Sequence, residues 1–127
     1  MKLEAKFPQK RVLITGANSG FGKAMAMHFG RNGWRVAVTG RRPDAVQAAA
    51  EDVRKAGAAE VLEIQIDVSK SDDFEVAARR IESQWGGLDI LVNNAGIHRR
   101  GTPTRYDPQD LEDVLAVNLV GCYHVVG

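Results

Sequence analysis

The sequence predicts an α/β fold, a doubly wound parallel sheet with helices on both faces. Short apolar runs alternate four times with longer segments that have helical periodicity. Glycine, proline or asparagine marks most of the changes between them. The first run, RVLIT at 11–15, is apolar without inward and outward alternation, as expected of a strand that helices cover on both sides. We therefore expect residues 1–127 to form a single domain of four β-α units.

The first half of the chain predicts two strand-helix pairs. The strand at 11–15 precedes a helix over 20–31, which ends at the turn signal Asn32-Gly33. WRVAVTG at 34–40 is the second strand. Pro43 begins the next helix, whose apolar face holds residues 46, 49, 50 and 53, and Gly57 ends it.

The second half continues the pattern. EVLEIQI at 60–66 alternates and is the third strand, and LDILVNN at 88–94 is the fourth. Between them a helix carries apolar residues at helical spacing from Phe74 to Trp85 and stops at Gly86-Gly87. A last helix begins near Asp107, a suitable N-cap, with Pro108 at its first position.

Right-handed crossovers between these units predict the strand order 3-2-1-4, with the switch point between strands one and four. This is a Rossmann-like arrangement. The sequence stops inside the last helix, after CYHVVG, without a cap. Because domains rarely end on an unsatisfied helix terminus, we expect a chain truncated before the fifth strand.

Composition excludes several classes of function. The net charge of +1 steers the protein toward neither nucleic acid nor anionic membrane, although arginines gather in 99–105. No apolar run could span a bilayer, and the N-terminus lacks a signal-peptide stretch. The single Cys122 excludes an internal disulfide and fits a reducing cytoplasm. The three histidines lie far apart, so no metal site is expected.

Three glycines, Gly16, Gly20 and Gly22, lie between the first strand and the first long helix. Glycine permits a tight turn and lets a pyrophosphate approach the backbone without a Cβ in the way. The free N–H groups and the dipole of the following helix favour an anion. The alternative is a glycine-rich turn that binds nothing, but its place after the first strand of a repeating β-α pattern favours phosphate.

The residues TGANSGFG at 15–22 resemble the TGxxxGxG motif of the short-chain dehydrogenase/reductase family. NNAG at 93–96 resembles the family's second motif, and Asp67-Val68 and NLVG at 118–121 match two further positions. The resemblance runs from Lys10 to the end of the chain and covers the N-terminal half of a typical member. It implies an NAD(P)-dependent oxidoreductase that transfers hydride between the cofactor and a carbonyl or alcohol.

The resemblance also implies which residues contact the cofactor. It places Asp67, with Val68 beside it, at the adenine amino group, whereas the residues alone also allow Asp67 to cap the next helix. By resemblance, Asn93 ties neighbouring strands, and Asp89 is expected to serve the structure near the start of strand four. The pyrophosphate and riboses would lie against Gly16, Asn18, Ser19, Gly20, Phe21, Gly22, Asn94, Ala95 and Gly96.

The choice of dinucleotide is a question of charge. An NAD site usually has an acidic residue at the end of strand two, on the ribose 2′-hydroxyl. This sequence has Arg41 and Arg42 there, and a guanidinium pairs with a 2′-phosphate. Two arginines can also form a solvated turn, and Asp44 weakens the signal. NADP is favoured over NAD.

Asn118 lies one turn from Val114 and Cys122 on the apolar stripe of the last helix. An unsatisfied amide there costs about 1–3 kcal/mol, so it is either a core residue bonded to backbone or a functional one. The resemblance implies the asparagine of a catalytic tetrad, whose other members are a Ser and a Tyr-x-x-x-Lys pair. Tyr106 and Tyr123 are not followed by lysine at that spacing, so these three members cannot be assigned.

These observations predict the cofactor-binding part of an oxidoreductase, inactive as the 127-residue chain alone. A small-molecule carbonyl or alcohol substrate would bind only in a complete chain. The alternative is a non-catalytic nucleotide-binding or self-associating module. An unpaired edge on strand four and an apolar face on the last helix would favour a homo-oligomer.

Overall fold

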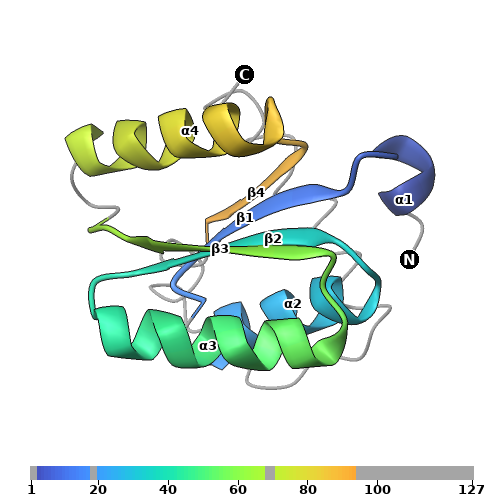
Figure 1. The fold of residues 1–127 in the computed structure, drawn as a ribbon, viewed down its shortest axis with the longest axis horizontal. Coiled ribbons are helices and arrows are strands. Elements are labelled where there is room, and N and C mark those ends of the chain that lie inside the picture. The colour runs from blue at the N-terminus through green and yellow to red at the C-terminus, as the bar shows by residue number, and fades with distance from the viewer. Residues whose placement is uncertain (1–2, 18–19, 68–70, 94–127) are drawn as a thin grey trace.

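The computed structural model describes residues 3–17, 20–67 and 71–93. The last predicted helix, from Asp107 onward, lies outside these residues. The elements are α1 Leu3–Lys6, β1 Arg11–Thr15, α2 Gly20–Arg31, β2 Arg35–Gly40, α3 Pro43–Ala56, β3 Glu60–Gln65, α4 Ser71–Trp85 and β4 Ile90–Asn93 (Figure 1).

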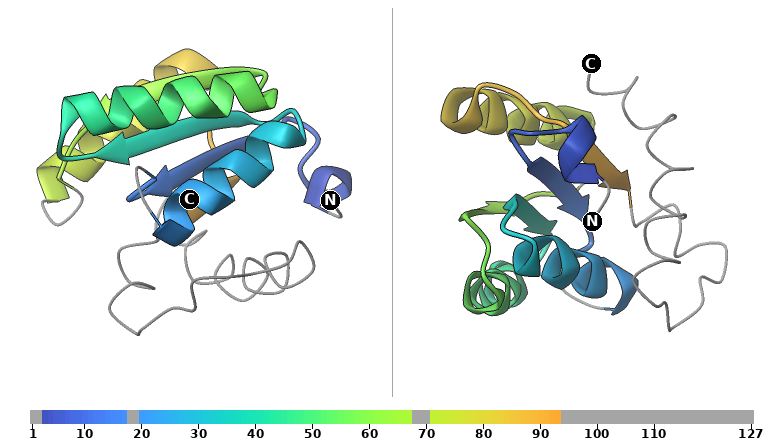
Figure 2. Two further views of the ribbon diagram at one scale, coloured as in Figure 1. Left: turned by 90° about the horizontal axis from the view of Figure 1, so that it is seen from below. Right: turned by 90° about the vertical axis from the view of Figure 1, so that its right-hand side faces the viewer.

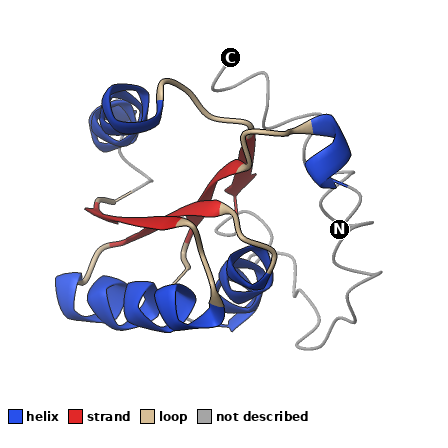
Figure 3. Cartoon of the chain, turned by 45° about the vertical axis from the view of Figure 1, so that its right-hand side comes forward, coloured by secondary structure: helices blue, strands red, loops and turns tan. Residues whose placement is uncertain are grey.

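The four strands form one parallel sheet in the order β3-β2-β1-β4, which confirms the predicted topology. Helices α2 and α3 cover one face and α4 covers the other, as Figure 3 shows. The fold is therefore the doubly wound, Rossmann-like α/β arrangement that the alternating pattern predicts.

Side chains of successive β1 residues pack into two separate hydrophobic cores, because the side chains of a strand alternate between its faces. Val12 and Ile14 pack with the apolar residues of α2 and α3, and Leu13 packs with those of α4. Trp34, which is fully buried, meets Phe29 edge-to-face with 4.7 Å between ring centroids. Both faces of the central strand are thus buried, which explains its unbroken apolar run.

Helices α2 and α3 lie side by side and approach each other closely at Gly30 (Figure 2). A Cβ added there would lie 3.0 Å from the Val53 carbonyl oxygen and 3.1 Å from its Cγ1. An ion pair of 2.7 Å between Lys23 and Asp52 joins the same helices at the surface. The hydrogen bond from Lys23 lowers the pKa of Asp52.

The observed elements differ from the predicted ones at several boundaries. The short helix α1 was not expected; Leu3 is buried and the Trp34 indole donates a 3.0 Å hydrogen bond to Glu4. Helix α4 begins at Ser71, before the first apolar position of its pattern. Strand β4 begins at Ile90 rather than residue 88, and the Asp89 N–H just before it donates a 3.1 Å hydrogen bond to the Arg11 carbonyl.

Two properties of the described ranges bear on function. Their helices are all too short or too polar to cross a lipid bilayer. Within the same ranges, His, Cys, Asp and Glu side chains do not gather in groups of three or more suited to a metal ion.

Candidate functional site

The candidate site lies at the carboxyl end of the sheet, where the four parallel strands finish at Thr15, Gly40, Gln65 and Asn93. The register aligns these ends, since Thr15 lies opposite Asn93 and Gly40 lies opposite Gln65. The chain leaves β1 toward α2 on one face, whereas α4, which precedes β4, lies on the other. In open α/β sheets, ligands bind in the crevice at this switch point.

Two threonine hydroxyls tie the strands together at this end. Thr15 donates to the Val92 carbonyl and Thr39 donates to the Ile14 carbonyl, both at 3.3 Å. Each threonine is only 1% exposed, so its hydroxyl needs a partner within the protein. The motifs do not indicate this role, although a threonine at the end of a buried apolar run is a usable signal. The bonds hold β4, β1 and β2 in fixed register beneath the glycine loop.

The loop after β1 turns through two glycines in the left-handed region. Gly16 has φ 62° and Gly20 has φ 58°, conformations that side chains disfavour. Gly20 is also the first residue of α2, whose first turn contains no acidic residue. The backbone N–H groups of a first helical turn point out of the helix end, where the helix dipole is positive, so this end of α2 suits an anion.

Phe21 and Gly22 differ from the rest of the loop because both are buried. The Phe21 side chain belongs to the core between α2 and the sheet. Phe21 would therefore contact a ligand through its backbone, which lies in the first turn of α2, and not through its side chain.

The turn after β2 presents two exposed arginines. Arg42 precedes α3 with extended backbone and makes a 3.5 Å ion pair with Asp44, both side chains being 76% exposed. The carbonyl oxygen of Arg41 accepts a 3.1 Å hydrogen bond from Nε2 of Gln65. The end of β2 therefore carries positive charge and no acidic residue at 41 or 42, as the sequence indicated.

Asp67 follows β3 at the same end of the sheet and is partly buried. Its backbone N–H donates a 2.9 Å hydrogen bond to the Asp73 carboxylate, from the first turn of α4. Asp73 thus fastens the end of β3 to α4, a contact that the sequence pattern does not predict. The adenine role of Asp67 stays a prediction.

The structure therefore brings part of the predicted site together. The following members lie along the carboxyl end of the sheet or in the segments that leave it: Gly16, Gly20, Phe21, Gly22, Arg41, Arg42 and Asp67. The others lie outside the described residues: Asn18, Ser19, Val68, Asn94, Ala95, Gly96 and Asn118. Asn93 ends β4, where its backbone lies opposite Thr15.

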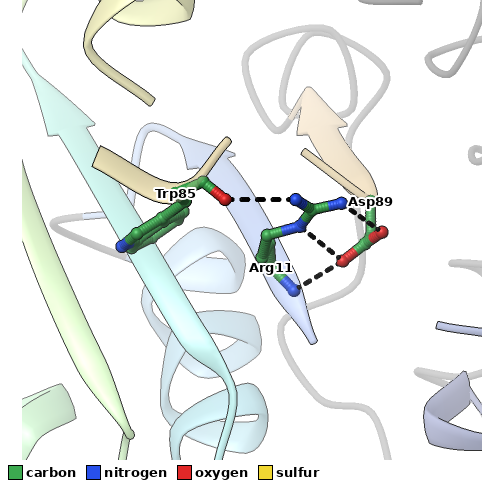
Figure 4. A network of polar contacts seen from close by, with 3 residues as sticks. All are labelled: Arg11, Trp85 and Asp89. Carbon is green, nitrogen blue, oxygen red and sulfur yellow. Dashed lines mark hydrogen bonds and ion pairs between the residues drawn. The ribbon is translucent and has the colours of Figure 1, made fainter. Parts of the chain in front are cut away.

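Asp89 holds the opposite end of the sheet, as Figure 4 shows. Its Oδ2 accepts from the backbone N and the Nε of Arg11, and its Oδ1 accepts from Nη2, all at 3.0 Å. Nη1 of Arg11 donates to the Trp85 carbonyl at 3.2 Å. The side-chain hydrogen bond to Asp89, together with the negative charges of Asp89 and Glu82, raises the pKa of Arg11 against the opposing effect of burial. The prediction that Asp89 serves structure near the start of strand four is confirmed.

Residues 10–127 match the family model described as short chain dehydrogenase. The chain belongs to this family. The chain is thus related to NAD(P)-dependent oxidoreductases.

Curated members of the family extend beyond this chain. A 3-oxoacyl-(acyl-carrier-protein) reductase of Staphylococcus epidermidis is 35% identical over 118 residues, which are 92% of this chain and 48% of the relative. A glucose 1-dehydrogenase of Gluconobacter oxydans is 37% identical over 116 residues, 91% of this chain and 44% of the relative. The chain spans about half the length of these relatives.

Solved structures show the same likeness. The L-sorbose reductase of Gluconobacter frateurii, complexed with NADPH and L-sorbose, matches with a TM-score of 0.60 and 33% identity, over 65% of this chain and 32% of that one. An NADH-dependent reductase complexed with NAD matches with a TM-score of 0.60 and 27% identity, over 66% and 35%. Both cofactors occur among similar structures, so a preference must be argued from this chain's own residues.

Proposed function

We propose that this chain is the cofactor-binding part of an oxidoreductase that transfers hydride between NADP(H) and a carbonyl or alcohol substrate. The observation that carries the proposal is the turn between β1 and α2. It combines two left-handed glycines with a helix N-terminus at the switch point of the sheet. When bound, the dinucleotide would supply or accept the hydride, and the residues of this chain would bind and orient it.

The groups present suit a pyrophosphate. Gly16 and Gly20 keep side chains away from the backbone at the turn, and the first turn of α2 offers N–H donors without a competing carboxylate. Buried threonines hold the strands beneath the turn. A site on a fixed sheet loses little conformational entropy when the ligand binds.

The charges after β2 support NADP over NAD. A carboxylate at this position would repel a 2′-phosphate, whereas Arg41 and Arg42 attract it. Both guanidinium groups are exposed, so salt will weaken the attraction. Asp67, at the end of β3, is proposed as the acceptor for the adenine amino group.

We also propose that these 127 residues do not catalyse turnover by themselves. The residue four positions after Tyr106 is Asp110, and the one four positions after Tyr123 is Gly127. Neither tyrosine has the lysine that would lower the pKa of its hydroxyl for acid-base work. Asn118 is the proposed member of the tetrad in this chain, and the alternative is a nucleotide-binding module without catalysis.

Calorimetric titration of the 127-residue protein with NADP⁺ and NAD⁺ tests the cofactor site. We expect binding of both, tighter for NADP⁺, and a severe loss of both in Gly16→Ala, because a Cβ forces the turn out of its φ of 62°. Gly86→Ala is the matched control: φ is 77° there, but the residue lies at the far end of the sheet. Absence of binding by the unaltered protein, or equal losses in both variants, would contradict the assignment.

An assay of NADPH oxidation with aldehydes and ketones tests the second proposal. The 127-residue chain should bind the cofactor and show no enzymatic oxidation. Turnover well above the rate without protein would show that residues of this chain replace the missing tyrosine and lysine.

A further inference from the structure

The turn that carries the two arginines is tied to the neighbouring strand by one side chain. Gln65 is the last residue of β3 and lies opposite Gly40, the last residue of β2. Its Nε2 donates a 3.1 Å hydrogen bond to the carbonyl oxygen of Arg41, just after β2 ends. The next backbone bond of the ladder, from the Ile66 N–H to the Gly40 carbonyl, is 3.0 Å long. Arg41 is therefore the first residue after β2 whose carbonyl is held by a side chain.

The two arginines are engaged differently. Arg42 already faces Asp44 at 3.5 Å, and its carbonyl oxygen accepts the 3.0 Å hydrogen bond from the Val46 N–H that starts α3. The guanidinium of Arg41 forms no hydrogen bond or ion pair with the part of the chain that the structure describes. Arg41 thus has a carbonyl held by Gln65 and an available charge, whereas Arg42 must leave Asp44 to contact a ligand.

We propose that Gln65 is a positioning residue for the 2′-phosphate of the cofactor, acting through the backbone of Arg41. The inference rests on the proposed NADP site. An exposed turn that carries a charge must be ordered when the charge binds, and ordering opposes binding. The amide of Gln65 orders the turn in advance. It also adds no negative charge beside the phosphate, which a glutamate at the same position would do.

The test isolates the phosphate by comparing two ligands, adenosine 2′,5′-bisphosphate and adenosine 5′-monophosphate, which differ only at the 2′ position. Gln65→Met keeps the length of the side chain and removes the donor. We expect it to weaken binding of the bisphosphate about three- to tenfold in calorimetric titration, the range for loss of one hydrogen bond. Binding of the monophosphate should not change.

Two further variants complete the experiment. Gln65→Glu removes the donor, since a carboxylate only accepts hydrogen bonds, and it also adds a negative charge. It should therefore weaken binding of the bisphosphate more than Gln65→Met does. Gln84→Met is the matched control, because Gln84 is an exposed glutamine of α4, close to the opposite end of the sheet. It should leave both affinities unchanged. Thermal unfolding of each variant should stay close to that of the unaltered protein, because Gln65 is exposed.

The outcomes separate the two proposals. If the unaltered protein binds neither ligand, the proposed cofactor site is wrong and the role of Gln65 falls with it. If it prefers the bisphosphate but Gln65→Met keeps that preference, only the role of Gln65 is overturned. If Gln65→Met weakens both ligands equally, Gln65 supports the sheet in general and does not position Arg41.

Discussion

At the scale of single residues, charged side chains have different surroundings at the two ends of the sheet. Arg11 and Asp89 form a three-bond contact at the amino end, with side chains only 13% and 14% exposed. The exposed charges of Arg41 and Arg42 lie at the carboxyl end. The amino end is thus held by satisfied charges, whereas at the carboxyl end the Arg41 guanidinium stays available for a ligand and that of Arg42 pairs with Asp44.

Asp89→Asn should lower the free energy of unfolding by about 2 kcal/mol. The variant leaves the partly buried Arg11 without its counter-charge and loses charge-assisted hydrogen bonds. Urea unfolding followed by circular dichroism measures the change. The control is Glu75→Gln, which removes the exposed ion pair with Arg79 and should change stability by less than about 0.5 kcal/mol. Equal changes in the two variants would refute the distinction between buried and exposed pairs.

Glu4 should make stability depend on pH in the acid range. Burial opposes its charge, but hydrogen bonds from the Trp34 indole and from its own backbone lower its pKa below the ordinary 4.5. The folded-state pKa is the lower one, so this contribution is present above pH 4.5 and is lost as the pH falls through the folded-state value.

Urea unfolding at pH 7 and near pH 3, followed by tryptophan fluorescence, measures this effect. At pH 7 the Glu4→Gln variant should be less stable than the unaltered protein by about 1 kcal/mol. The difference should shrink near pH 3. A difference that stays constant with pH would show that the Glu4 charge contributes nothing.

At the scale of elements, the close contact of α2 with α3 sets the position of both helices on the sheet. Gly30→Ala should lower stability by about 1–3 kcal/mol, because the new Cβ lies 3.0 Å from the Val53 carbonyl oxygen. Intrinsic helix propensity acts in the opposite direction and favours alanine by about 1 kcal/mol. Ala48→Gly, at an exposed position of α3, calibrates that propensity. If Gly30→Ala stabilises the protein, the contact is looser than the structure indicates.

The two outer strands of the described sheet differ in how they are protected. On β3, the Glu63 carbonyl accepts a 2.7 Å hydrogen bond from Arg80, and the Glu63 carboxylate pairs with Arg54 at 2.7 Å. Charged side chains along a strand oppose pairing with another chain. Within the described residues, β4 is paired with β1 alone and its strand contains no charged residue. Association through the sheet is therefore expected at β4.

At the scale of the whole molecule, we expect the 127-residue protein to form a homo-oligomer through β4 or the segment after it. Light scattering after size exclusion, at micromolar concentration, measures the mass directly. Species of two or more chains are expected in the unaltered protein. Arg80→Ala, which would remove the hydrogen bond to the Glu63 carbonyl on the β3 edge, should not be needed to produce them. A monodisperse monomer of 13.8 kDa would contradict this.

The sequence alone determined the four strands, the helices α2 to α4 and their order. Apolar runs, helical spacing and the turn signals at Gly33, Gly57 and Gly86 are local properties, and right-handed crossovers leave few ways to arrange four β-α units. The motif at 15–22 likewise identified the family and the turn that the structure bends through Gly16 and Gly20.

Tertiary structure alone decided the contacts between distant residues. Helix α1 has four residues, too few for periodicity, and Trp34, which bonds to Glu4 across 30 positions, supports it. The Arg11–Asp89 contact joins residues 78 positions apart, and Gln65 reaches Arg41 across 24. Such pairs depend on strand register and side-chain direction. Register follows from how the apolar faces of the whole sheet are buried together, which the residues near one position do not specify.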